Sequence, residues 1–230
     1  MAGMVIIGAG HAAGQAAASL RQEKYTGPIT IIGDEAHLPY QRPPLSKAYL
    51  SGSQEVDRVY LRAEKFYQEK EIDLKLSTRA TAIDPDAKAV ELEDGSKIDY
   101  DKLLISTGSR PRLLSIPGSD LGGIHYLRTI DDVDGIRADM HEGANLVIVG
   151  GGYIGLEVDA VGVEQGLNVH VLEMEDRILQ RVTTPTMSKY YDELHRGRGV
   201  QIHTNTGVTG FSGDAKVQKV VCGDTEFPAD

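Results

Sequence analysis

The stretch Val5-Ile6-Ile7-Gly8-Ala9-Gly10 decides how this chain folds, because a short apolar run ends there in closely spaced glycines. Such β-branched runs are typical of strands buried on both faces of a parallel sheet. The Ala-rich stretch 12–20 that follows favours a helix that packs closely on a sheet. Ile29-Thr30-Ile31-Ile32 predicts a second strand, and Asp34 and Glu35 come shortly after it. The segment therefore predicts a strand, a glycine turn, a helix, a strand and an acid.

The same pattern recurs 142 residues later, where Gly150 takes the place of Gly8. Leu146-Val147-Ile148-Val149-Gly150-Gly151-Gly152 is again an apolar run that ends in glycines, and a predicted helix follows it to about Gln165. Val169-His170-Val171-Leu172 predicts the closing strand, and Glu173 is the acid. An internal repeat of this kind indicates two units of similar design.

Each glycine of such a turn has its own physical task when a dinucleotide binds. The first makes the tight turn, the second leaves room for the pyrophosphate, and the third lets helix and strand pack closely. The pyrophosphate meets the free N–H groups at the positive end of the helix, and the acid bonds the ribose hydroxyls. The first copy has alanine at the third position, an accepted variant, with a glycine just beyond it. The candidate pyrophosphate residues are Gly8, Gly10, Ala13, Gly14, Gly150, Gly152 and Gly155.

A single glycine pattern is weak evidence, because Gly-rich turns are common. Two copies, each between a strand and a helix and each closed by an acid, indicate two dinucleotide sites. Glu173 follows Gly155 by 18 residues, and its carboxylate would repel a 2′-phosphate. NADH is therefore favoured over NADPH at the second site. Arg177 is the first cation after Glu173, and its alternative reading is a surface arginine.

Composition narrows the function classes. The net charge of −10 argues against nucleic acid, whose phosphates attract a basic surface. Cys222 is the one cysteine, so the chain has no intramolecular disulfide, no redox-active Cys pair and no thiolate metal cluster; we expect no metal. The N-terminal residues do not resemble a signal peptide, and no apolar run is long enough to span a membrane. We therefore expect a cytoplasmic protein.

The region between the two copies has a different pattern. Alternating residues predict three short strands, with Asp94-Gly95 as a hairpin turn, and a further buried strand at 103–106. Prolines and glycines at 110–118 predict a linker, which places a domain boundary near residue 112. The three short strands are predicted at 80–84, 88–93 and 97–100. Later in the chain we expect a helix at 186–196, a strand at 200–204 and a small meander at 208–211, 216–222 and 225–227.

The segment Leu38–Lys47 contains three prolines, which fix an extended backbone. Arg42 and Lys47 bracket its stiff part, and two cations on a rigid loop suit a reduced flavin or a pyrophosphate. The alternative is a solvated proline loop. We also expect a helix to open at or just before Ser46 and to run towards Leu50.

The stretches VIIGAG, GDEAHLPYQRPPLSK, STGSRPR and VIVGGGYIGLE together resemble the FAD-dependent, NADH-using ferredoxin reductases of the putidaredoxin, rubredoxin and biphenyl-dioxygenase systems. The resemblance implies an α/β fold of two nested, doubly wound, Rossmann-like domains of three layers. Residues 1–112 would form the first segment of the FAD domain, and residues 113–230 a nearly complete NAD domain. The implied activity takes hydride from NADH and passes single electrons to a ferredoxin or rubredoxin (EC 1.18.1 type). No Cys pair lies beside the expected flavin, so the electrons would leave to a docked iron–sulfur protein.

The resemblance also implies roles for single residues. Asp34 or Glu35 would bond the adenosine ribose of FAD, and Tyr153 would lie between nicotinamide and flavin unless it is only a packed tyrosine. The catalytic residues would be Lys47, Glu157 and Tyr153. Other residues along FAD would be Arg42, Lys47, Ala80, Thr107, Gly108 and Arg110. Those facing NADH would be Gly150, Gly152, Tyr153, Ile154, Gly155, Glu157 and Glu173.

The chain departs from the family in two respects. Asp230 is reached where the last strand of the family's NAD domain begins, so we expect the second FAD segment and the C-terminal interface domain to be absent and the FAD domain to be incomplete. A truncated, non-catalytic FAD/NAD-binding fragment, perhaps in a swapped homo-oligomer, is the alternative to the reductase; an NADH oxidase or a nitrite reductase component is a third reading. Asp159 stands where the family usually has alanine, and a carboxylate packed on a sheet needs a partner. His170 in its apolar strand is expected to be a packed or edge histidine.

Overall fold

The computed structural model describes residues 2–230. The chain divides into two compact units, one formed by Met1–Arg42 and Gln54–Arg110 and the other by Pro43–Ser53 and Pro111–Asp230. The division differs from the expected domains in one respect. Residues 43–53 were expected within 1–112, but they belong to the second unit because they pack on helices of that unit.

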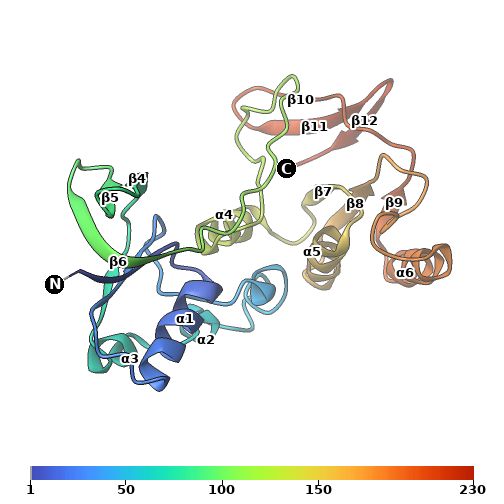
Figure 1. Cartoon of the computed structure of the whole chain (residues 1–230). Helices are drawn as coiled ribbons and strands as arrows, with labels where there is room; N and C mark the ends of the chain where they lie inside the picture. The colour runs from blue at the N-terminus through green and yellow to red at the C-terminus, as the bar shows by residue number, and fades with distance from the viewer. Residues whose placement is uncertain (1) are drawn as a thin grey trace. The chain divides into compact units, whose positions relative to one another are not determined.

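The first unit is built on a six-stranded sheet in the order β3-β2-β1-β6-β5-β4. The first four strands of that order are parallel, and the last two add an antiparallel hairpin beside the long β6 (Figure 1). The strands are β1 (Gly3–Ile7), β2 (Ile29–Ile32), β3 (Ile72–Lys75), β4 (Ala80–Asp84), β5 (Ala89–Leu92) and β6 (Lys97–Ile105).

Helix α1 (His11–Gln22) covers one face of this sheet and connects β1 to β2. Its small residues Ala13 and Ala17 are fully buried against Ile6 and Ile31. Small side chains allow the helix axis to come close to the sheet, as the Ala-rich sequence predicts. The first glycine turn is thereby fixed at the carboxyl end of β1.

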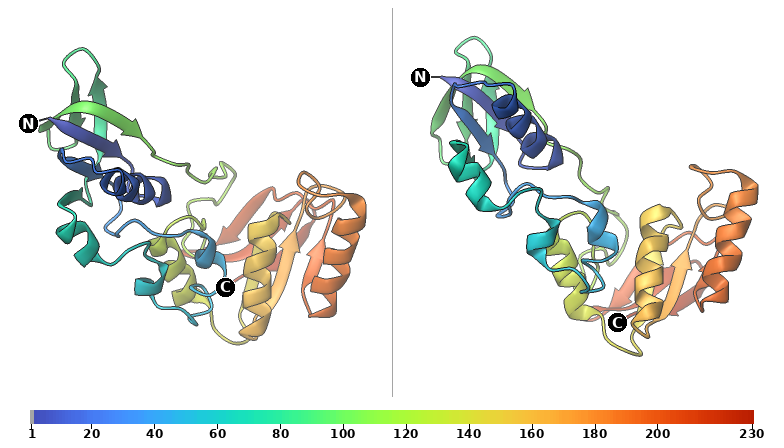
Figure 2. Two further views of the ribbon diagram at one scale, coloured as in Figure 1. Left: turned by 60° about the horizontal axis from the view of Figure 1, so that its bottom comes forward. Right: turned by 90° about the horizontal axis from the view of Figure 1, so that it is seen from below.

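The second unit repeats this plan with a parallel sheet in the order β7-β8-β9. Its two long helices lie on one face of the sheet, and an antiparallel meander packs on the other (Figures 1 and 2). The strands and helices are β7 (Asn145–Val149), α5 (Tyr153–Glu164), β8 (Asn168–Leu172), α6 (Pro185–Gly197) and β9 (Gln201–His203). The meander comprises β10 (Gly210–Gly213), β11 (Val217–Cys222) and β12 (Thr225–Pro228).

The expected α/β fold is confirmed, since both units carry the strand, glycine turn, helix and strand in the predicted positions. Two local predictions are wrong. No helix runs from Ser46 to Leu50; a short 3-10 helix, η1 (Pro43–Ser46), ends at Ser46, and hydrogen-bonded turns follow it. The strands expected at 97–100 and 103–106 form the single strand β6, because its first part pairs with β5 and its second part with β1.

Three further helices were not predicted. They are α2 (Val56–Val59), α3 (Glu64–Glu69) and α4 (Ile130–Asp139). Helix α4 begins with a capping box in which Thr129 and Asp132 exchange side-chain and backbone hydrogen bonds. Among the described residues, no helix has both the length and the apolar character needed to cross a membrane.

Candidate functional site

The first glycine of each turn has a backbone conformation that glycine alone adopts readily. Gly8 has φ of 102° and Gly150 has φ of 108°. A Cβ atom on Gly8 would also lie 2.3 Å from the carbonyl oxygen of Ser106. Both N–H groups donate to the last residue of the neighbouring strand, Gly8 to Ile32 at 2.7 Å and Gly150 to Leu172 at 2.8 Å. These two glycines are therefore required by the fold itself.

The second glycine of each turn is different, because the fold does not require it. Gly10 has φ of −86° and Gly152 has φ of −83°, which any residue can adopt. A Cβ atom built on either would meet no described atom within 4 Å. The space beside both glycines is thus open to a ligand that approaches the backbone, which is what a pyrophosphate needs.

The third position of each turn lies between helix and strand. A Cβ atom on Gly155 would lie 2.3 Å from the carbonyl oxygen of Gly150. The first copy has room for Ala13, which is fully buried, while Gly14 faces Pro39, whose Cβ atom would lie 2.7 Å from an added methyl. The third positions therefore have the close packing of helix against strand that the sequence predicts for them.

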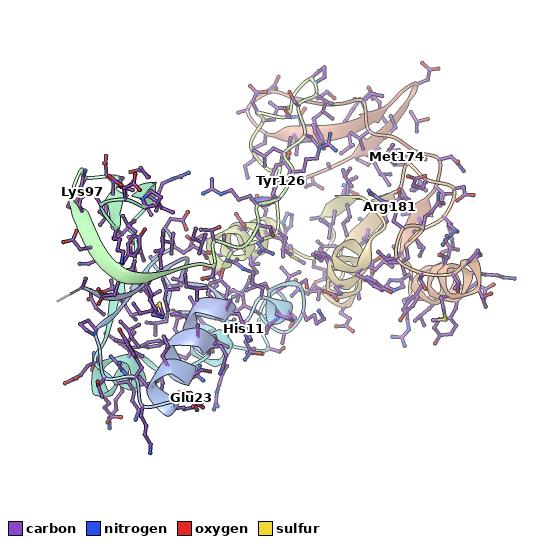
Figure 3. All side chains as sticks on the ribbon, in the orientation of Figure 1. His11, Glu23, Lys97, Tyr126, Met174 and Arg181 are labelled. Carbon is purple, nitrogen blue, oxygen red and sulfur yellow. The ribbon has the colours of Figure 1, made fainter. Side chains whose placement is uncertain are left out.

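Both turns lead into helices whose N-termini are free of capping side chains and of acids. Helix α1 starts after Gly10, at His11 (labelled in Figure 3), and α5 starts after Gly152; neither has a side-chain cap or an acidic residue in its first turn. In contrast, α4 and α6 are capped by Thr129 and Thr184. The N–H groups at the starts of α1 and α5 are thus available to an anion.

Glu173 lies directly after β8, beside the second glycine turn. Its carboxylate accepts hydrogen bonds from the backbone N–H of Gly151 at 2.8 Å and of Glu175 at 2.9 Å. Two backbone donors hold the carboxylate in place next to the turn while leaving lone pairs on both oxygens for further donors. In the first unit the residue directly after the second strand, at the position that corresponds to Glu173, is Gly33. A Cβ atom on Gly33 would lie 2.3 Å from Cβ of Ala9, so a larger residue does not fit there.

The two candidate acids of the first unit have different partners. Glu35 accepts hydrogen bonds from Tyr40 at 2.6 Å and from Arg42 at 2.7 Å. Asp34 is half exposed and forms a longer ion pair of 3.3 Å with Arg110. The structure thus pairs each acid with a cation that was itself a candidate cofactor residue, and it leaves the choice between the two acids open.

Arg177 is engaged inside the loop that connects β8 to α6 (Figure 3 labels Met174 and Arg181 on the same loop). Its guanidinium donates to Ser188 Oγ at 2.5 Å and to the carbonyl oxygens of Thr183 at 3.2 Å and Gln180 at 3.0 Å. Arg177 is therefore a structural residue of the loop rather than the surface arginine considered from the sequence.

Lys47 and Glu157, which are far apart in sequence, form an ion pair within the second unit. Nζ of Lys47 lies 2.6 Å from Oε2 of Glu157, and the Ser46 hydroxyl donates to the same oxygen at 2.5 Å. The sequence offered both charged residues as candidates but did not reveal that they meet, and it did not single out Ser46. No local pattern signals such a contact, because it joins η1 to the middle of α5.

The remaining candidate residues lie at the ends of elements. Tyr153 and Ile154 begin α5 and are about half exposed, as is Val149 at the end of β7, so exposed apolar side chains both precede and follow Gly152 in the chain. Ala80 starts β4, Thr107 follows β6, and Gly108 has φ of 71°. A cavity of about 410 Å³ opens beside the second turn, along β7; its lining includes Gly150, Ile154 and Gly155.

Asp159 has the partner that its burial demands. It is 0% exposed, and its Oδ1 lies 2.7 Å from Nδ1 of His195 on α6, while Oδ2 has no hydrogen-bond partner among the described residues. Burial raises the pKa of Asp159, and the contact with His195 opposes that shift. His170 stacks on His203 with Nδ1 and Nε2 3.1 Å apart, so its expected role as a packed histidine fits.

Comparisons with known proteins agree with this geometry. Residues 3–230 match the family model described as pyridine nucleotide-disulphide oxidoreductase. The chain is 42% identical to putidaredoxin reductase CamA of Pseudomonas putida over 99% of its own length and 56% of the relative's. It is also 42% identical to the ferredoxin–NAD(+) reductase subunit of the benzene 1,2-dioxygenase system of Pseudomonas putida, over 96% of this chain and 54% of that protein.

Among solved structures, the covalent putidaredoxin reductase–putidaredoxin complex contains a chain that superimposes with a TM-score of 0.95 at 41% identity, covering 100% of this chain and 57% of that one. The chain thus spans about half the length of the curated relatives it matches. The residues that match the family model include both glycine turns, the acids that follow β2 and β8, and the Lys47–Glu157 pair. The chain belongs to the pyridine nucleotide-disulphide oxidoreductase family.

Proposed function

We propose that the chain binds FAD at the Gly8–Gly14 turn and NADH at the Gly150–Gly155 turn. The observation that carries this proposal is the open space beside Gly10 and Gly152, two glycines that the folded chain itself does not require. The uncapped N-termini of α1 and α5 add backbone donors and a positive dipole end at the same two places. The order of the two cofactors follows from the resemblance to the ferredoxin reductases.

The preference for NADH over NADPH rests on Glu173 and is strengthened by Arg177. Two backbone N–H groups hold the Glu173 carboxylate beside the turn, where it accepts hydrogen bonds from ribose hydroxyls and repels a 2′-phosphate. Arg177, the first cation after it, donates to two carbonyl oxygens of its own loop and to the Ser188 hydroxyl on α6. A 2′-phosphate would have to compete with those bonds for the guanidinium.

We further propose that the chain is the nucleotide-binding part of an NADH-dependent ferredoxin reductase that serves an oxygenase system, with a ferredoxin or rubredoxin as its electron acceptor. The support is the names of its relatives, which include putidaredoxin reductase and ferredoxin–NAD(+) reductase subunits, and a solved complex of such a reductase with putidaredoxin. The absence of a cysteine pair in the sequence supports an external acceptor rather than an internal disulfide.

The residues of the second unit suggest what the chain itself contributes. When bound, the two cofactors supply hydride transfer and the release of single electrons. Tyr153 and Glu157 lie four residues apart on α5 and so share one face of that helix. The ion pair with Lys47 fixes the Glu157 carboxylate on this face. We assign Tyr153 to cover the nicotinamide ring, and Lys47 and Glu157 to orient the reacting end of NADH.

The competing proposal is a fragment that binds one or both nucleotides without turnover, alone or in a swapped oligomer. One experiment separates the two. The purified 230-residue chain is loaded with FAD, freed of unbound flavin and titrated with NADH without oxygen. Loss of the visible flavin absorbance supports the reductase. A chain that retains FAD and binds NADH, yet keeps its flavin oxidised, is the non-catalytic fragment.

A further inference from the structure

Residues 43–53, called the strap below, leave the first unit after Arg42 and return to it at Gln54, but they pack within the second unit. The strap contacts α4 and α5 through η1, and Figure 2 shows its light-blue ribbon beside both helices. Leu45 and Leu50 are completely buried. An apolar anchor on each side therefore fixes the backbone of the strap around Ser46 and Lys47.

Two donors of the strap reach the same oxygen of Glu157, but they differ in burial. Lys47 approaches Oε2 at 2.6 Å, yet half of its side chain is exposed, so water and salt weaken this ion pair. Ser46 is 4% exposed and donates to Oε2 at 2.5 Å. A hydroxyl shielded from water holds its acceptor in one geometry more firmly than a flexible, solvated ammonium group does.

A second buried hydroxyl ties the strap to α4. The Tyr49 hydroxyl donates to Oδ1 of Asp134 at 2.8 Å, and the guanidinium of Arg137 lies 5.5 Å from the centre of the Tyr49 ring. Burial and the nearby Asp134 raise the pKa of Tyr49 to about 12, so the phenol keeps its proton as a donor. Gln165, just beyond α5, donates to the carbonyl oxygen of Ser51 at 3.3 Å. After Ser46, the strap is thus hydrogen-bonded to α4 through Tyr49 and to the end of α5 through Ser51.

We propose that Ser46 is a positioning residue that sets the orientation of the Glu157 carboxylate towards the nicotinamide end of NADH. The proposal rests on the assignment of the second glycine turn to NADH. Glu157 lies one helical turn after Tyr153, and its carboxylate reaches the strap through Ser46 and Lys47. Ser46 touches no reacting atom in this account; it acts only through Glu157.

Limited trypsin digestion tests the contact without any cofactor. Lys47 is the only basic residue of the strap, and trypsin does not cut readily between Arg42 and Pro43, so cleavage within this region reports on Lys47. A lost hydrogen bond of about 1 kcal/mol raises the open population, and with it the cleavage rate, about fivefold in Ser46→Ala. Ser46→Thr restores the wild-type rate. Ser51→Ala, which removes a strap hydroxyl bonded only to Ala48 and Ser53, leaves the rate unchanged.

A double-mutant cycle shows whether Ser46 acts through Glu157. Glu157→Ala removes the acceptor of the Ser46 hydroxyl, so the cleavage rate of Ser46→Ala/Glu157→Ala is expected to match that of Glu157→Ala, whereas independent effects on the rate would multiply. In the FAD-loaded chain, Ser46→Ala is expected to slow flavin reduction by NADH at least about fivefold while the Kd for NADH changes less than twofold.

The outcomes separate this proposal from the function on which it rests. If wild-type flavin is not reduced by NADH, the reductase proposal fails, and the double-mutant cycle is then read from trypsin cleavage alone; cleavage effects that combine independently overturn the link between Ser46 and Glu157. If wild-type flavin is reduced and Ser46→Ala reduces it equally fast, Ser46 is not a positioning residue. An unchanged cleavage rate in Ser46→Ala overturns the contact itself.

Discussion

Replacing Gly152 by alanine separates what the fold needs from what a ligand needs. The backbone of Gly152 has φ of −83° and ψ of 176°, so alanine fits without strain, and its methyl group meets no described atom within 4 Å. Alanine has fewer conformations than glycine in the unfolded chain, which raises the free energy of unfolding by about 0.4–1 kcal/mol. Alanine is a poorer N-cap than glycine by a similar amount, so the two effects offset each other to within about 0.5 kcal/mol. The free energy of unfolding should therefore hardly change.

Affinity for NADH is expected to respond very differently. The added methyl group occupies the space through which the pyrophosphate would approach the start of α5, and a clash there should weaken binding at least about tenfold, which is about 1.4 kcal/mol. Stability is measured by urea unfolding followed by circular dichroism, because the chain has no tryptophan. Affinity is measured by titrating the fluorescence of NADH.

Gly155→Ala is the matched control for a structural glycine. Its Cβ atom would lie 2.3 Å from the carbonyl oxygen of Gly150, so the helix must move away from the strand at a cost of about 1–3 kcal/mol. Wild-type affinity for NADH in Gly152→Ala, or a loss of stability as large as that of Gly155→Ala, would refute the assignment of Gly152 to a ligand rather than to the fold.

Three further predictions follow from the other contacts. Glu173→Arg should weaken NADH and strengthen NADPH binding, measured as the ratio of the two Kd values; an unchanged ratio would remove Glu173 from the ribose site. Gly10→Val should abolish retention of FAD on gel filtration, and full flavin content in this variant would contradict the first turn as the FAD site. His195→Leu should destabilise the chain by about 3–5 kcal/mol at neutral pH, because it leaves the Asp159 carboxylate buried and unpaired, and Asp159→Ala in addition should restore stability. Because burial raises the pKa of Asp159 in the folded chain above its ordinary 3.8, the deficit of His195→Leu should shrink as the pH falls towards that value; a deficit independent of pH would exclude an unpaired carboxylate as its cause.

Local patterns were sufficient to predict both glycine turns. Each turn is specified by neighbouring residues: an apolar run before it, a glycine with positive φ in it and a helix-forming segment after it. These signals lie within about 20 residues of one another, the range over which sequence patterns predict structure best. Helix α4 was missed although Thr129 and Asp132 form a capping box, which is itself a local signal. Strand β3 was also missed, although Ile72–Lys75 alternates apolar and charged side chains, which is a local signal of a strand.

The contacts made by the candidate residues could not be predicted, because they join elements far apart in the chain. Ser46 and Glu157 are 111 residues apart, and Asp159 and His195 are 36 apart. The need of Asp159 for a partner was evident from its place in the helix, but the identity of that partner depends on how α6 packs. Likewise, the strap was assigned to the first unit by its position in the sequence, whereas its buried leucines place it in the second.

If one chain carries two separate dinucleotide sites, the stoichiometry of binding reveals both. Equilibrium dialysis of the purified chain with FAD and NADH should give one molecule of each per chain. Gly10→Val should remove only the FAD, and Gly152→Ala only the NADH. A single dinucleotide bound per chain in total, or wild-type binding of both cofactors in either variant, would contradict the presence of two separate sites.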